Sequence, residues 1–194
     1  MSKAEDCTDN DLFLKAATTN YKVNPSGAAA YFLFKLNAQS GNVAAAIKYM
    51  EQAISFADEE PNEDAEYYYE LATFCYKASK SANAIDYAKK AAAADKNNTV
   101  KGKAYMLAAT VWANTKCSGN EIQQRAKFWV AVDYLNKCRQ SDATLAAEAN
   151  KQIAQFSSYF PQTAEAFMYD VQDGQTYEVV CGDLRDATIV RTQK

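Results

Sequence analysis

Apolar and small side chains recur at helical spacing through the middle of the chain, which predicts paired amphipathic helices. The clearest unit runs from Ala65 to Asn98 and reads AEYYYELATFCYKASKSANAIDYAKKAAAADKNN. The small residues in its second half allow two antiparallel helices to approach closely. The expected packing positions are Tyr68, Leu71, Ala72 and Cys75 on the first helix and Ala84, Ala88 and Ala91 on the second. Such a unit cannot bury its apolar face alone, so it must stack on neighbours.

The same spacing predicts further units within a helical domain at 1–175. They are a partial repeat at 11–25 ended by Asn24-Pro25, repeats at 27–60, 65–98 and 102–141, a capping helix at 145–159 and a short helix at 163–169. In the last repeat, the expected link at 116–121 is followed by a second helix with apolar residues on more than one face. The packing positions of these units are Ala30, Leu33, Phe34, Ala46, Met50, Ala53, Tyr105, Ala108, Ala109, Trp112, Ala131, Leu135, Cys138, Ala149, Ile153 and Phe156.

The C-terminal end of the chain loses the helical pattern. Runs at 176–181 (TYEVVC) and 187–192 (ATIVRT), joined by 182–186, predict a β-hairpin over 176–192. Two strands alone are marginal in water, so we expect the hairpin to dock on the helices as a cap. The alternative is that it adds a strand to a partner.

Composition agrees with a mainly helical chain of 194 residues, because 48% are hydrophobic and only 6 are Gly and 3 Pro. Charge is unevenly distributed. Residues 1–70 carry 5 basic and 12 acidic side chains, residues 71–139 carry 12 and 4, and residues 140–194 carry 4 and 8. The excess of basic side chains in residues 71–139 either attracts an acidic segment of a partner or means only that these helices have basic faces in contact with solvent. The net charge of -3 argues against general nucleic-acid binding.

Cysteines and carboxylates offer no clear metal site. The five cysteines form no CxxC pair and the chain has no His, so we expect no bound metal. Cys75 and Cys138 fall on packing faces and are expected to be small buried hydrophobes, while an odd count leaves at least one thiol unpaired. The acidic link at 58–66 lacks the spacing of a calcium loop and is expected to be a solvated loop.

The sequence also lacks the usual elements of catalysis. There is no His for acid–base work, no serine in a nucleophile elbow and no Gly-rich phosphate loop, so we expect no enzyme activity and no cofactor. No apolar run approaches the length of a membrane span, and the N-terminus lacks the apolar stretch of a signal peptide. The chain is expected to be soluble, and the sequence does not determine its cellular compartment. An alternative is that it is the processed part of a longer exported protein.

The repeats resemble the tetratricopeptide repeat family, most strongly at 65–98, well at 27–60 and partly at 102–141. The C-terminal part also resembles the tail of bacterial tetratricopeptide repeat proteins, which are usually longer, exported chains. That likeness lies in RAKFWVAVDYLNKC at 125–138, SSYFP at 157–161 and EAFMYDVQDGQTYEVVCGDLRDATIVRTQK at 165–194. The resemblance implies a right-handed α-solenoid that binds proteins.

The resemblance also implies a concave groove lined by the first helix of each repeat. Tyrosines there would suit peptide recognition, because they combine apolar area with a hydrogen-bonding tip; alternatively, Tyr31, Tyr69 and Tyr76 pack between helices. Of the positions of a carboxylate clamp known in some members, only Lys103 matches, so no clamp is expected. The matching groove positions are Ala28, Tyr31, Lys35, Gln39, Glu66, Tyr69, Thr73, Tyr76, Lys77, Lys103, Met106, Thr110 and Asn114.

The leading interpretation is a non-catalytic scaffold that binds an unidentified peptide or protein segment in this groove. A second interpretation is a structural or self-assembly part of a longer protein, which associates through its repeat ends or its hairpin. A third is an accessory protein that captures glycan, in which Trp112 or Trp129 would report on sugar binding.

Overall fold

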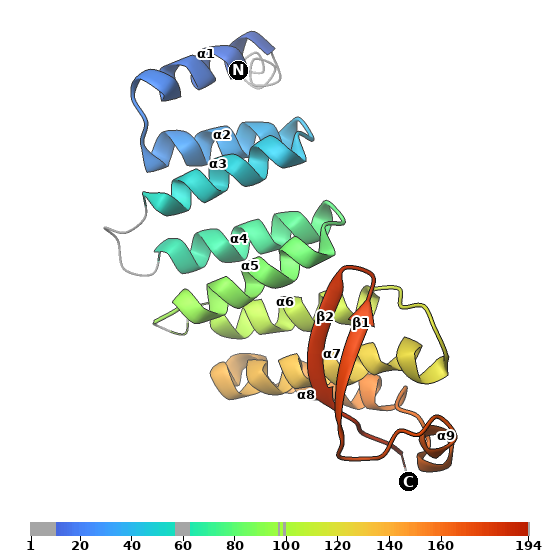
Figure 1. The fold of residues 1–194 in the computed structure, drawn as a ribbon. Coiled ribbons are helices and arrows are strands. Elements are labelled where there is room, and N and C mark those ends of the chain that lie inside the picture. Colours follow the sequence, from blue (N-terminus) through green and yellow to red (C-terminus); the bar gives the residue numbers. More distant parts are fainter. Residues whose placement is uncertain (1–10, 57–62, 97, 99, 194) are drawn as a thin grey trace, which may run out of the picture.

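The structure, a computed structural model, describes residues 11–56, 63–96, 98 and 100–193. Its helices stack as antiparallel neighbours along one direction, and a two-stranded sheet lies against the last of them (Figure 1). The predicted fold class, a mainly α solenoid of helical repeats with a C-terminal β-hairpin, is confirmed. The helices are α1 (Asp11–Val23), α2 (Gly27–Gln39), α3 (Val43–Ser55), α4 (Glu63–Lys77), α5 (Ser81–Ala94), α6 (Lys101–Asn114), α7 (Glu121–Ser141), α8 (Ala146–Ser157) and α9 (Thr163–Phe167), with a short 3-10 turn at Ala143–Leu145 before α8.

Three helix pairs, α2–α3, α4–α5 and α6–α7, form the body of the stack. Helix α1 packs on α2 at one end, and α8 covers α7 at the other. Nearly all predicted packing positions are buried; Tyr68, Tyr105, Ile153 and Phe156 are partly buried at the edge of the core. Alanines at the contacts keep the helices close, so even a short pair forms part of a continuous core.

The two cysteines expected in the core are there. Cys75 lies on α4 and Cys138 on α7, and both are buried free thiols. Burial raises the pKa of each thiol to about 11, with a smaller contribution from Glu51 near Cys75 and from Asp142 near Cys138. Both therefore stay protonated at neutral pH and act as small apolar side chains.

Helix α7 is longer than the second helices of the other pairs, with 21 residues against 13 in α3 and 14 in α5. It is covered by α6, α8 and the hairpin, which explains why apolar residues occupy more than one of its faces. Trp129 on α7 and Trp112 on α6 are both 0% exposed. Neither indole can therefore stack on a sugar, which removes the signal proposed for glycan capture.

The acidic link differs in extent from the expected loop. Its residues 58–62 lie outside the described residues, but α4 already begins at Glu63. Asp64 and Glu66, at the end of the predicted link, therefore belong to the first turns of a helix, where acidic side chains interact favourably with the helix dipole. The link between α5 and α6 is also organised by a carboxylate. Buried Asp95 accepts hydrogen bonds from the backbone N–H groups of Val100 (2.7 Å) and Lys101 (2.6 Å), at the start of α6.

The hairpin pairs β1 (Thr176–Cys181) with β2 (Leu184–Ile189) in antiparallel register. The first strand matches the prediction, but the second begins three residues earlier than the predicted 187–192. The reason is the turn: Gly182 adopts a φ of +61°, so Gly182 and Asp183 alone reverse the chain. This register also turns Leu184 and Thr188 inward, where both are buried.

The hairpin docks on α7 through polar contacts around Asp133 and Asp186. The Tyr134 hydroxyl on α7 donates to Asp186 (2.6 Å), which also forms an ion pair with Lys89 on α5 (3.0 Å). Asp133 on α7 accepts hydrogen bonds from Thr188 and pairs with the Arg191 guanidinium. The hairpin therefore bridges two second helices, α5 and α7.

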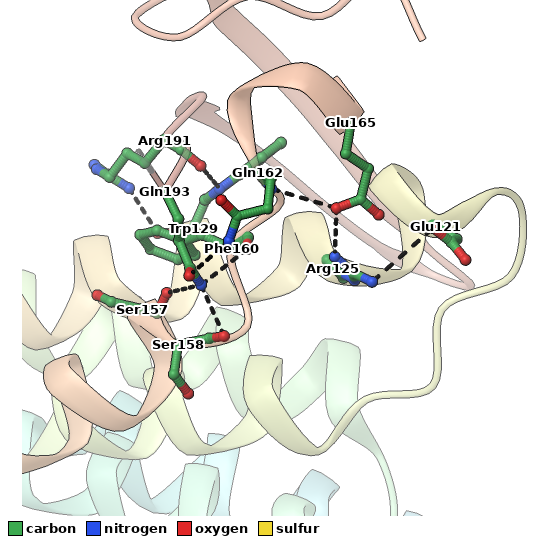
Figure 2. Close-up of polar contacts among 10 residues, drawn as sticks. All are labelled: Glu121, Arg125, Trp129, Ser157, Ser158, Phe160, Gln162, Glu165, Arg191 and Gln193. Atoms are coloured by element: carbon green, nitrogen blue, oxygen red, sulfur yellow. Dashed lines mark hydrogen bonds and ion pairs between the residues drawn. The ribbon is translucent and has the colours of Figure 1, made fainter. Parts of the chain in front are cut away.

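The segment after β2 is held against the end of the stack (Figure 2). The indole N–H of Trp129 donates to the carbonyl of Arg191 (2.8 Å), and the guanidinium of Arg191 donates back to the carbonyl of Trp129 (3.1 Å). The Gln193 amide donates to three carbonyls at the end of α8, those of Ser157 (3.1 Å), Ser158 (2.8 Å) and Phe160 (3.0 Å). A helix end leaves its last carbonyls without the usual N–H partner, and Gln193 supplies donors there; the Ser157 carbonyl also accepts from the N–H of Phe160 (3.1 Å).

A disulfide between Cys117 and Cys181 joins the α6–α7 link to the end of β1. The sequence indicated only that an odd number of cysteines leaves one thiol unpaired, and it gave no pairing. The bond spans 64 positions of sequence, so it strongly restricts the unfolded chain. The disulfide holds β1 on one side of the hairpin turn, and the contacts of Asp186 with Tyr134 and Lys89 hold β2 on the other side.

Removing this disulfide with Cys117→Ala and Cys181→Ala should lower the free energy of unfolding by about 2–4 kcal/mol. Chemical denaturation with and without a reducing agent measures this. Reduction should destabilise the wild type to the level of the double variant and leave the double variant unchanged. Equal stability of the two proteins under oxidising conditions would contradict a stabilising role for the bond.

Candidate functional site

The groove residues expected from the sequence lie on α2, α4 and α6, the first helices of the three pairs. We call the exposed side of these helices the first-helix face. None of the expected residues is buried: Lys35, Gln39, Glu66, Lys77, Lys103 and Asn114 are exposed, and Tyr31, Tyr69, Thr73, Tyr76, Met106 and Thr110 are partly exposed. The hairpin packs against α7 and pairs with α5, which leaves this face uncovered by it.

A cavity of about 610 Å³ opens on the first-helix face between α2 and α4. Its floor is apolar. The rings of Phe34 and Phe74 meet edge to face, with centroids 5.5 Å apart and planes at 84°, and so join the two helices. Ala38 and Ala78 also line the cavity, and neither side chain fills it because neither extends beyond a methyl group. The cavity is large enough to accept a bulky apolar side chain.

One side of the rim is a polar cluster around Glu70. The Lys35 ammonium forms an ion pair with this carboxylate, and the Tyr31 hydroxyl donates to it (2.9 Å). Burial alone would lower the pKa of Lys35, but the hydrogen bonds with Glu70 and Tyr31 raise it above its ordinary value. Burial raises the pKa of Tyr31. At neutral pH, Lys35 is therefore charged and Tyr31 is a neutral hydrogen-bond donor.

Other residues that line the cavity carry groups that remain available. Lys77 ends α4 and forms no ion pair within the described residues. Gln39 ends α2 and has an exposed amide. The Thr73 hydroxyl donates to the carbonyl of Tyr69 (2.9 Å) and keeps its lone pairs. A ligand above the apolar floor would thus meet one free cation and several polar groups.

The remaining expected residues are divided between packing and open surface. Tyr76 accepts a hydrogen bond from Asn114 (2.8 Å), which joins α4 to α6. Tyr69 packs against the small cluster of Ala91, Ala92 and Ala104. Tyr31 stacks on Tyr67, with centroids 5.1 Å apart. Tyr31, Tyr69 and Tyr76 therefore all make contacts with neighbouring helices, as the packing alternative expected. The structure does not bring Glu66, Lys103, Met106 and Thr110 into the cavity.

Sequence reasoning missed several residues of the cavity. Glu70 was not among the expected groove residues, although it holds Tyr31 and Lys35 in place. Ala38, Ala78 and Val43 were not singled out, and Phe34 was identified only as core. The signal that would have found them is the pair of small residues, Ala38 and Ala78, at the ends of adjacent first helices.

In the part of the chain that the structure describes, no group of three or more Cys, Asp and Glu side chains is arranged to hold a metal ion. Among the described helices, none combines the length and apolar character needed to cross a bilayer.

No protein-family model matches the chain, and no curated protein matches it. Among solved structures, the chain is similar to one described as "Crystal structure of MamA protein", at 20% identity and a TM-score of 0.49, over 81% of both chains. A second, described as "Crystal structure of MamA", aligns at 20% identity and a TM-score of 0.47, over 81% of this chain and 86% of the other. The helical-repeat architecture therefore rests on the structure of this chain itself.

Replacing Glu70 by Ala should lower the free energy of unfolding by about 1 kcal/mol, because Tyr31 and Lys35 lose their shared partner while remaining partly solvated. Glu66→Ala, one turn earlier on the same helix, should change it by less than about 0.5 kcal/mol. Urea denaturation of both variants tests this, and equal effects would show that the cluster contributes no stability.

Proposed function

We propose that this protein is a non-catalytic scaffold that binds a peptide or protein segment on its first-helix face. The observation that carries the proposal is the cavity between α2 and α4, with its apolar floor and polar rim. A bulky apolar side chain of the partner would occupy the cavity. The backbone of the partner would then meet the amide, hydroxyl and ammonium groups of the rim. A few well-desolvated anchors usually supply most of the binding energy at such surfaces.

Preorganisation is the physical basis of this proposal. The Phe34–Phe74 contact and the Tyr31–Glu70–Lys35 cluster join α2 to α4, and the Tyr76–Asn114 hydrogen bond joins α4 to α6. The walls of the site therefore need little ordering when a ligand binds, which preserves affinity. Membership of the tetratricopeptide repeat family, which the sequence pattern suggests, is consistent with this use of first helices.

We also propose that the protein works in an oxidising compartment outside the cytosol. The support for this is the Cys117–Cys181 disulfide, because stable structural disulfides are typical of exported proteins and rare in the cytosol of most organisms. The resemblance of the C-terminal part to exported bacterial chains points the same way.

The groove proposal is tested by filling the cavity. A random peptide library is selected against the wild type, and the affinities of enriched peptides are measured by fluorescence polarisation. Ala38→Trp should weaken their binding by tenfold or more, about 1.4 kcal/mol, because the indole occupies the anchor site. Enriched peptides should contain a bulky apolar residue.

The matched control is Ala147→Trp, which adds the same side chain at an exposed position of α8. It should leave affinity unchanged, and circular dichroism should show both variants folded. Peptides that bind Ala38→Trp as tightly as the wild type would exclude the cavity as the anchor site.

A second candidate function, self-assembly, is favoured by apolar side chains at both ends of the stack. On α1, Val23 is 72% exposed. At the opposite end of the stack (Figure 1), Phe167, the last residue of α9, and Met168, which follows it, are 72% and 82% exposed. Different surfaces at two ends suit head-to-tail association, which leads to open chains of subunits.

Self-assembly predicts that the mass measured by light scattering rises with protein concentration. Met168→Glu and Val23→Glu should each reduce that rise, because each places a charge in the contact. Val180→Glu, which alters an exposed apolar residue of the hairpin, is the control and should have no effect. If the measured mass equals that of one chain at every protein concentration, self-assembly is excluded.

A further inference from the structure

A second cavity, of about 420 Å³, lies where three segments distant in sequence meet. They are the α4–α5 turn, the α6–α7 link and the turn of the hairpin. We call this the turn-edge surface and define it by Ser79, Lys80, Ser81, Lys116 and Asp183. It does not belong to the first cavity, but the two are adjacent along the chain, because Lys77 and Ala78 line the first and Ser79 follows directly.

The turn-edge surface has an excess of positive charge. Lys80 and Lys116 line the cavity from two different segments, and both are exposed. Neither forms an ion pair within the described residues, whereas six other basic side chains there do. The single carboxylate at the cavity belongs to Asp183, so the two lysines leave it net positive. Lys77 adds a third cation without an ion pair on the side of the first cavity.

The walls of this surface are held in place. In the α4–α5 turn, the N–H of Lys80 bonds to the carbonyl of Cys75 (2.8 Å). In the α6–α7 link, the Lys127 ammonium donates to the carbonyl of Thr115 (2.7 Å), and Asn120 and Gln123 cap the start of α7 reciprocally. The Cys117–Cys181 disulfide then ties that link to the hairpin turn. The two lysines are therefore carried on fixed backbone segments.

We propose that the turn-edge surface binds a carboxylate-rich segment of the partner that occupies the first-helix face. Lys77 lines the first cavity and Lys80 and Lys116 line the second, and none of the three has an ion-pair partner among the described residues, so together they complement a run of acidic side chains. Hydroxyls of Ser79 and Ser81 add hydrogen-bond donors for carboxylates. This inference rests on the proposed function, because it assigns one peptide to both surfaces.

A peptide fits this arrangement better than a nucleic acid. The first cavity has an apolar floor sized for a side chain, and the basic groups lie beyond its rim, so the ligand needs an apolar anchor followed by acidic groups. The net charge of -3 would also repel a long polyanion outside the basic region. An oligonucleotide therefore serves as the competing ligand in the test.

The test measures binding of fluorescein-labelled peptides in which a phenylalanine precedes a run of glutamates, and of a matched peptide with alanine in place of the phenylalanine. Lys80→Glu with Lys116→Glu should weaken both peptides by roughly tenfold at low salt, because two attractions become repulsions. Raising the salt concentration should shrink the difference between wild type and variant. Lys80→Arg with Lys116→Arg should bind as the wild type does.

The matched control is Lys48→Glu with Lys151→Glu, which makes the same change of charge on exposed positions of α3 and α8. If it weakens binding as much as the turn-edge variant, the effect is one of net charge and the proposal is wrong. The proposal is also wrong if the turn-edge variant binds the glutamate peptides as tightly as the wild type. Equal or tighter binding of an oligothymidylate of the same charge would likewise overturn the assignment to a peptide.

Ala38→Trp separates the two proposals. If Ala38→Trp loses binding and Lys80→Glu with Lys116→Glu does not, the first cavity remains the binding site and the proposal of an acidic segment on the turn-edge surface is wrong. Loss in the turn-edge variant alone would support the acidic segment and reject the apolar anchor. Breaking the disulfide with Cys117→Ala and Cys181→Ala should reduce binding of the phenylalanine-free peptide several-fold, because one lysine-bearing wall loses its tie to the hairpin.

Discussion

Close contact between helices through alanine is the constraint on which the rest of this structure depends. Each helix pair is too short to bury its own apolar face, so it is stable only when packed against the next. Ala84, Ala88 and Ala91 allow α5 to lie against α4 and α6, and Ala46 and Ala53 do the same for α3. The first helices contribute buried alanines as well, such as Ala72 and Ala108, but their outer face carries larger and more polar side chains.

The C-terminal hairpin reinforces that division. It covers α7, pairs with Lys89 on α5 and is tied by a disulfide to the α6–α7 link. The final segment satisfies carbonyls at the end of α8 through Gln193. These contacts close one end of the stack and the side of the second helices, so the face of α2 and α4 that carries the cavity is left open.

On that face, the side chains of Lys35 and Glu70 both join α2 to α4 and line the cavity. Glu70 holds Lys35 and Tyr31, and both members of the ion pair stay partly solvated, with side-chain exposures of 46% for Lys35 and 33% for Glu70. Exposed pairs of this kind contribute little to stability. Their larger effect is to hold the side chains at the rim of the cavity in fixed positions.

The sequence by itself determined the helices, their small packing positions and the first strand. All of these depend on local periodicity, which a single segment displays. Only the tertiary structure decided which residues meet across segments: the Cys117–Cys181 pair, the register of β2, the Glu70 cluster and the cavity between Ala38 and Ala78. Such contacts depend on how helices distant in sequence are spaced and rotated, and that is set by the packing of the whole stack.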